Sequence, residues 1–307
     1  MSAATGGVEP AVETLRLEVG AATEAAGRDV NQDVAIAIPL ARPGLDVDDY
    51  LLAIADGMGG HPAGDVASHI AVDTVRGALA QPASEDISQL LKQAYRKAND
   101  AILSAGETEP TNKGMGTTLT AAVIRGKYAT IANVGDSRAY LLRGNGLTQI
   151  SRDHTVTAED LAARRIDPEA ARTDPRRNIL THAVGTAPKL DSKLPNVYEL
   201  TLLPDDRLLL CSDGLYSALE ETDLRRVLSS ADAQTAAREL VRLAQQQGTS
   251  DNASAAVAIA VPTRIRVVTV PAPVTRTGGV PGTAIAAAVA VLLIMLLILA
   301  VFILGNQ

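Results

Sequence analysis

Apolar residues in this chain follow two different periods, which predict strands in some regions and helices in others. Short apolar runs bounded by Gly, Asp or Asn predict strands at 50–55, 118–124, 128–134, 139–142, 207–211 and 253–261. Apolar residues spaced three and four apart predict helices over 66–79 and after Ser84, which can cap the second helix. Consecutive helices followed by consecutive strands favour an antiparallel α+β fold over repeated βαβ units.

A third pattern stands at the C-terminal end, where residues 283–304 form an uncharged apolar run of 22 residues. As a helix this run is about 33 Å long, enough to cross the hydrocarbon core of a bilayer. Arginines precede the run at 264, 266 and 276 and no charge follows it, so the rest of the chain is predicted to face the cytoplasm. We therefore expect a single-pass cell-membrane protein that contacts lipid through this helix. The run contains no Gly-x-x-x-Gly motif, and whether the helix oligomerises stays open.

These patterns divide the chain into four segments. Residues 1–13 lack a signal-peptide pattern and form a flexible tail, and residues 14–261, which contain no internal repeat, form one domain. Residues 262–282 contain four prolines and form a linker to the transmembrane helix at 283–304.

Composition limits the range of partners. The chain has 307 residues with 47% hydrophobic composition, enough for a sizeable core. Its formal net charge is −7 and it contains no dense Lys/Arg run, which argues against a nucleic-acid partner. The single cysteine, Cys211, cannot form an intramolecular disulfide and is typical of a reducing compartment.

Carboxylates recur where the predicted strands end. A single Asp-Gly pair is ordinarily a turn, but here five carboxylates stand at or near such ends: Asp33, Asp56, Asp136, Asp213 and Asp251. If these strands share one sheet system, the carboxylates gather at one edge, where their mutual repulsion calls for bound cations. The chain has only 4 His, so all-oxygen ligation favours Mg²⁺ or Mn²⁺ over zinc.

Such a centre predicts phosphoester chemistry. Two ions bridged by one carboxylate can activate a shared water for attack on phosphorus and hold the phosphate oxygens. Gly57, without a Cβ, lets its carbonyl turn toward an ion. Arg28 is a candidate phosphate clamp, because a guanidinium matches two phosphate oxygens.

Seven short motifs, in this order, resemble those of the metal-dependent protein serine/threonine phosphatases of the 2C family, bacterial type. They are Arg28-Asp29-Val30-Asn31-Gln32-Asp33, Asp56-Gly57-Met58-Gly59-Gly60-His61, Gly114-Met115-Gly116-Thr117-Thr118, Gly135-Asp136-Ser137-Arg138, Asp153-His154-Thr155, Asp213-Gly214 and Ser250-Asp251-Asn252. The resemblance spans about residues 14–261. It implies an α+β fold with a central β-sandwich of two antiparallel sheets flanked by helices, to which the sequence adds the C-terminal transmembrane helix.

The resemblance also implies roles for single residues. Asp56 would bridge two core Mn²⁺ or Mg²⁺ ions, with the Gly57 carbonyl on one and Asp213 and Asp251 on the other. Asp33 would support this cluster, and Asp136 with Asp213 would hold a third, weaker ion. Arg28 would bind the substrate phosphate, so that Arg28 and Asp56 are the catalytic residues. Residues 155–181, with helix-like stretches at 158–164 and 168–173, would form a flap over the site.

The proton donor to the leaving group stays open. Animal-type members of the family carry a histidine directly after the Asp-Gly pair, whereas this chain has Met58 there and its histidine at His61. The donor is then either His61 or a metal-bound water. His154 and His182 are interpreted as structural.

The predicted function is hydrolysis of phosphoserine and phosphothreonine in proteins, including bacterial Ser/Thr kinases and their substrates, by a catalytic domain that is monomeric. The specific phosphoproteins and the metal used in the cell stay open. Two alternatives are another metal-dependent phosphoesterase, which the scarcity of aromatic residues disfavours, and a non-catalytic module that docks phosphoproteins. Loss of a metal carboxylate would favour the docking module, and all five are present.

Overall fold

The computed structural model describes residues 12–40, 49–59, 63–80 and 86–265, apart from the side chains of 12–14, 264 and 265. The predicted linker beyond 265, the predicted transmembrane segment, Ser84 and His61 lie outside these residues. No helix within the described ranges is long and apolar enough to cross a membrane.

One sheet has the strand order β2-β3-β5-β6-β9, with the short β4 paired to β3. Its members are β2 (Asp33–Leu40), β3 (Asp49–Met58), β4 (Gly116–Thr117), β5 (Leu119–Arg125), β6 (Tyr128–Val134) and β9 (Asn196–Thr201). Every pairing is antiparallel.

The other sheet has the order β1-β11-β10-β7-β8 and is also antiparallel. Its members are β1 (Val12–Glu24), β7 (Arg138–Arg143), β8 (Gly146–Gln149), β10 (Arg207–Cys211) and β11 (Ala253–Ile265). The long pairing of β1 with β11 runs past the expected domain limits of 14 and 261 at both ends.

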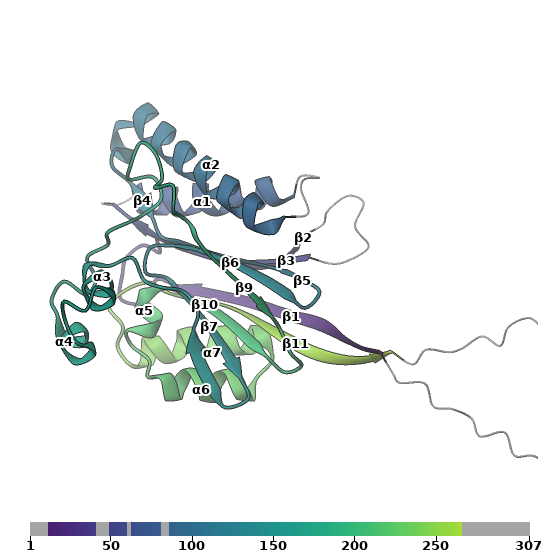
Figure 1. The fold of residues 1–307 in the computed structure, drawn as a ribbon. Coiled ribbons are helices and arrows are strands. Elements are labelled where there is room, and N and C mark those ends of the chain that lie inside the picture. Colours follow the sequence, from purple (N-terminus) through teal and green to yellow (C-terminus); the bar gives the residue numbers. More distant parts are fainter. Residues whose placement is uncertain (1–11, 41–48, 60–62, 81–85, 266–307) are drawn as a thin grey trace, which may run out of the picture. The chain divides into compact units, whose positions relative to one another are not determined.

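The two sheets face each other (Figure 1), and apolar side chains from both fill the layer between them. Side chains alternate along each strand: Leu52 and Ile54 of β3 meet Leu208 and Leu210 of β10 in this layer. The alternate residues of β3, Leu51 and Ala53, point to the opposite face, which helices cover. This two-sheet arrangement with helices outside confirms the fold class predicted for the catalytic domain.

Helices α1 (Ala63–Leu79) and α2 (Ile87–Thr108) cover the outer face of the first sheet, and the 3₁₀ turn η1 (Pro110–Asn112) follows (Figure 1). The N-cap of α2 is Asp86, whose carboxylate accepts a hydrogen bond from the Gln89 amide. The prediction that Ser84 caps this helix is therefore wrong, because the first helical residue is Ile87 and the cap directly precedes it.

Helices α5 (Asp213–Tyr216), α6 (Glu221–Ser230) and α7 (Ala233–Gln246) cover the outer face of the second sheet (Figure 1). Leu240 and Val241 of α7 are buried there, where α7 packs against β1 and β11.

The predicted flap, residues 155–181, is a long loop whose two ends are hydrogen-bonded to each other. Thr155 pairs with Leu180 in an isolated β-bridge, and the Thr181 amide donates to the His154 carbonyl. Between them lie α3 (Val156–Ala162), which starts two residues before the predicted helix, and α4 (Pro168–Thr173), which matches the prediction.

Candidate metal and phosphate site

An acidic cleft of about 680 Å³ lies where strand ends of both sheets meet. Its lining residues are Arg28, Gln32, Asp56, Gly57, Met58, Gly59, Thr118, Asp136, Asn178, Leu180, Asp213, Asp251 and Asn252. The structure thus brings together every predicted site residue except Asp33, which is buried directly beneath the cleft, opposite Asp56 in the β2–β3 pairing.

The backbone of Asp56 is held on both sides. Its amide donates to the Thr118 hydroxyl at 3.0 Å, and its carbonyl accepts from the Thr118 amide and the Thr117 hydroxyl, each at 2.9 Å. These bonds fix the backbone at the point where Asp56 lines the cleft. Burial, followed by repulsion from Asp33, raises the pKa of Asp56 well above its ordinary value.

Asp33 is a buried acid with only half of its carboxylate paired. Its Oδ2 accepts a hydrogen bond from Ser254 at 2.7 Å, whereas its Oδ1 is buried without a partner among the described residues. Burial raises the pKa of Asp33 to about 7, with repulsion from Asp213 and Asp251 adding to the rise.

Asp213 opens α5 and stands near Asp251, which precedes β11. Gly214 allows this approach, because a Cβ there would lie 2.1 Å from the Asn252 carbonyl oxygen. The Oδ1 atom of Asp213 is also buried and lacks a partner within the described part of the chain. Burial and repulsion from Asp251 raise the pKa of Asp213.

Asp136 lies in the turn between β6 and β7, where Gly135 has a φ of +103°. A side chain at position 135 would also collide with Thr118, so the turn requires glycine. Burial raises the pKa of Asp136 to about 7, and repulsion from Asp213 adds to this.

This donor set fits hard divalent cations. Five carboxylates repel one another, two buried oxygens lack partners in the described structure, and all donors are oxygen atoms. In the described residues no three Asp, Glu, His or Cys side chains are already grouped closely enough to form a metal cage. The carboxylates instead surround the cleft, and they shift one another's pKa values across it.

Among the described residues that line the cleft, Arg28 is the only basic one. Its Nη2 lies 2.8 Å from the Asp251 carboxylate, and its Nε donates to the Ser250 carbonyl at 3.2 Å. The side chain is 50% exposed, so the rest of the guanidinium remains accessible to a ligand.

Position 57 requires glycine because the neighbouring backbone leaves no room for a side chain. A Cβ there would lie 2.1 Å from the Gly64 carbonyl oxygen and 2.8 Å from the Gln32 carbonyl oxygen. The Gln32 carbonyl also accepts the Gly57 amide at 3.1 Å, which fixes the strand where it enters the cleft.

The described histidines make structural contacts. His154 Nδ1 accepts a hydrogen bond from the Gly135 amide at 3.0 Å, and its Nε2 lies 3.0 Å from the Asn196 amide group. Burial, with His182 nearby, lowers the pKa of His154 to about 4, so the ring is neutral at pH 7.

Several cleft residues were not predicted as functional. Gln32, Thr118 and Asn252 lie inside the motifs, but the sequence alone assigns them no task. The Asn252 side chain accepts from the Gln32 amide and donates to the carbonyls of Ala25 and Val30, which ties the Arg28 loop to β11. Asn178 and Leu180 come from the flap and have no sequence signal, because only the return of the flap brings them to the cleft.

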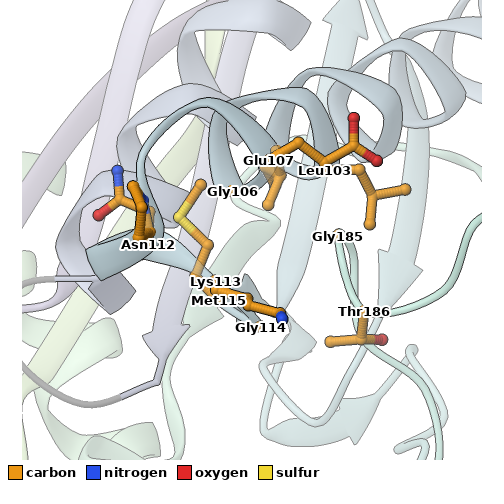
Figure 2. A pocket seen from close by; sticks show the side chains of 11 residues that line it. Leu103, Gly106, Glu107, Asn112, Lys113, Gly114, Met115, Gly185 and Thr186 are labelled. Carbon is orange, nitrogen blue, oxygen red and sulfur yellow. The ribbon is translucent and has the colours of Figure 1, made fainter.

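A second cavity, of about 560 Å³, lies between the end of α2, the 112–115 segment and Gly185-Thr186 (Figure 2). Its charged lining residues are one acid, Glu107, and one base, Lys113. Its described lining contains a single carboxylate and so offers no donor set comparable to that of the cleft.

A cleft of carboxylates and one arginine, at the edge of a two-sheet sandwich, belongs to the class of metal-assisted phosphoester hydrolases. A family model for protein phosphatase 2C matches residues 19–253. The serine/threonine phosphatase Stp of Listeria welshimeri is 40% identical over 184 residues, which are 59% of this chain and 72% of that protein.

Solved structures give the same result. The Mycobacterium tuberculosis serine/threonine phosphatase PstP matches with a TM-score of 0.71 at 33% identity, over 80% of this chain and 99% of that one. The catalytic domain of PstP in complex with two manganese ions matches with a TM-score of 0.69 at 33% identity, over 81% and 100%. The chain belongs to the protein phosphatase 2C family and is a metal-dependent serine/threonine protein phosphatase.

Proposed function

We propose that the cleft holds two core Mn²⁺ or Mg²⁺ ions and hydrolyses phosphoserine and phosphothreonine in proteins. Asp56 would bind both ions, the Gly57 carbonyl would bind one, and Asp213 and Asp251 would bind the other. Asp33 would support this cluster, and Asp136 together with Asp213 would hold a third, weaker ion. This proposal rests on the Oδ1 atoms of Asp33 and Asp213, which are buried without a hydrogen-bond partner in the described structure. A bound cation would compensate such oxygens.

Bound divalent ions supply charge neutralisation for the phosphate and make water a stronger nucleophile at neutral pH. The chain's own residues do the rest. Arg28 binds two phosphate oxygens and so orients the phosphorus toward the carboxylate cluster. Asp56, held through Thr117 and Thr118, fixes the geometry of the site. The leaving oxygen takes its proton from His61 or from water in the cleft, since His154 is bonded elsewhere.

The substrates we propose are phosphorylated proteins, among them Ser/Thr kinases. The cleft is bordered by Asn178 and Leu180 of the flap and by the exposed Arg28, an arrangement that suits a phosphorylated side chain on an extended segment. We further propose that residues 283–304 span the cell membrane and hold the catalytic domain on its cytoplasmic side. The uncharged run and the arginines before it support this orientation.

The test is phosphate release by the full chain, purified in detergent and stripped of ions with a chelator. A phosphothreonine peptide should release phosphate only after Mn²⁺ or Mg²⁺ is added back. Asp213→Asn should reduce release by more than about 100-fold. Loss of a residue that only hydrogen-bonds to a metal ligand already costs roughly 10- to 100-fold, and Asp213 is proposed as a ligand itself.

Asp223→Asn is the matched control, since Asp223 lies on α6 and pairs with Arg226 away from the cleft. It should keep wild-type activity. Ion-dependent hydrolysis of nucleotides or small esters, but not of the phosphopeptide, would indicate another phosphoesterase. Binding of the phosphopeptide without release would indicate a docking module.

A further inference from the structure

Arg138 is a partly buried residue to which the proposed mechanism gives no task. It begins β7 and stands directly opposite Cys211 of β10 in the antiparallel pairing. Asp136 lies two residues before Arg138, and Asp213 lies two residues after Cys211. The pairing therefore makes both carboxylates leave the sheet at the same end.

The Arg138 guanidinium contacts three side chains, one in its own strand and two in other segments. It forms a bidentate ion pair with Asp153, in which the shortest N–O distance is 2.7 Å. Its Nη1 donates a hydrogen bond to the Tyr140 hydroxyl at 2.9 Å. Its central carbon lies 3.6 Å from the centre of the Tyr216 ring. A planar guanidinium can stack on a ring and bind a carboxylate at once, which an ammonium group cannot do.

These partners hold the two carboxylate-bearing segments. Asp153 precedes His154, whose ring and backbone amide both bond Gly135 at 3.0 Å. These bonds fix the start of the turn that carries Asp136, and the Arg138–Asp153 pair fixes its end. Tyr216 ends α5, the single helical turn that Asp213 begins. The Ser217 amide donates to the Asp213 carbonyl at 2.9 Å and closes that turn.

We propose that Arg138 is a positioning residue that fixes the spacing between Asp136 and Asp213 and thereby sets the affinity of the weaker ion site they share. The inference rests on the proposed function, which assigns an ion to this pair. Two like charges move apart unless their segments are held together. The stack on Tyr216 and the ion pair with Asp153 join those segments across the β7–β10 pairing.

Arg143 provides a matched control. It ends the same strand and also forms a bidentate ion pair, in which its Nη2 and Nε lie 2.6 and 2.9 Å from the carboxylate oxygens of Asp206. It also donates to the Thr201 carbonyl. Neither Arg143 nor its partners line the cleft.

The experiment is calorimetric titration of Mn²⁺ into the ion-free full chain in detergent, with thermal unfolding of the same samples. In Arg138→Lys, the dissociation constant of the weakest site should rise about tenfold, as for other residues that orient a metal ligand. The dissociation constants of the core sites should stay within about twofold of the wild-type values. If Arg138 also oriented the ligands of the core ions, those constants would rise at least about tenfold. Arg143→Lys should match the wild type at every site, and Asp136→Asn should lack the weakest site.

If Arg138→Lys does not fold, Tyr216→Phe and Tyr216→Leu replace it. Tyr216→Phe keeps the ring and should bind Mn²⁺ like the wild type. Tyr216→Leu removes the ring and should lower the Mn²⁺ affinity of the weakest site. An unchanged weakest site, equal weakening of all sites, or a wild type with only two sites would each overturn the inference. A wild type that binds no Mn²⁺ and releases no phosphate would instead overturn the proposed function.

Discussion

At the scale of single residues, the site consists of acids that the fold brings together without neutralising them. Burial is the largest cause of the raised pKa values of Asp33, Asp56, Asp136 and Asp213, and repulsion between the acids adds to it. Such groups are either protonated or compensated by cations. The ion-free protein therefore holds protons that bound ions would displace.

This leads to a prediction for the pH dependence of stability. In the ion-free folded protein Asp136 titrates at about 7, whereas its ordinary value is 3.8. Between these values the folded state binds more protons than the unfolded state, so the free energy of unfolding falls as pH rises from 3.8 to about 7. Below that window the contribution of Asp136 is fully present.

Urea unfolding in chelator at several pH values measures this dependence. Asp136→Asn, which cannot titrate, should show a smaller fall across the window than the wild type. Saturating Mn²⁺ should remove much of the fall, because the ions replace the protons. Equal slopes in the wild type and Asp136→Asn would contradict the assignment of the raised pKa to this residue.

At the scale of elements, position in the sheet decided which strands could be predicted. All six predicted strands are interior ones, and the predicted bounds of β6 and β10 match the structure. Five described strands were not predicted: β4, which has only two residues and pairs with β3, and β1, β2, β8 and β9, which form the four sheet edges. Edge strands are partly exposed and carry mixed side chains, as β9 does, so their apolar signal is weak.

The docking of α2 on its sheet gives the prediction at this scale. Tyr95 is fully buried, and its hydroxyl lies 2.7 Å from the Ala132 carbonyl and 3.1 Å from the Leu119 carbonyl. Tyr95→Phe removes the only proton that this side chain offers them. We expect a loss of ~1–3 kcal/mol in the free energy of unfolding, the cost of a buried polar group without its partner.

Tyr128→Phe is the control, because Tyr128 is 60% exposed. It should change the free energy of unfolding by less than ~0.5 kcal/mol. Both variants are compared by urea unfolding at one pH in the presence of Mn²⁺. Equal midpoints for the two would show that the Tyr95 hydroxyl does not stabilise the contact between α2 and the sheet.

At the scale of the whole molecule, the sequence predicted the acidic part of the cleft better than its border. Asp56 lies near the end of β3, and Asp136 and Asp213 follow β6 and β10. The antiparallel pairings of these interior strands bring the three acids to one edge. Asn178 and Leu180 reach the cleft only because Thr155 pairs with Leu180 and closes the flap. That contact depends on tertiary folding and follows no local period.

The catalytic and anchoring parts of the chain should be separable. The cleft residues all lie between Arg28 and Asn252, so a chain ending at Ile265 should keep ion-dependent phosphate release from a peptide. The full chain should float with lipid vesicles in a density gradient, and the shortened chain should not. The physical reason is the apolar run 283–304, which loses favourable burial when it leaves the bilayer.

Two double substitutions within the run distinguish insertion of this segment into the bilayer from binding of the chain to the membrane surface. Leu296→Arg with Leu297→Arg should abolish flotation, because each arginine costs about 2.5–3.5 kcal/mol at the centre of a membrane helix. Leu296→Ala with Leu297→Ala keeps the run uncharged and should still float. If the arginine variant floats like the alanine variant, the chain is held at the membrane surface by other contacts, and the transmembrane proposal is wrong.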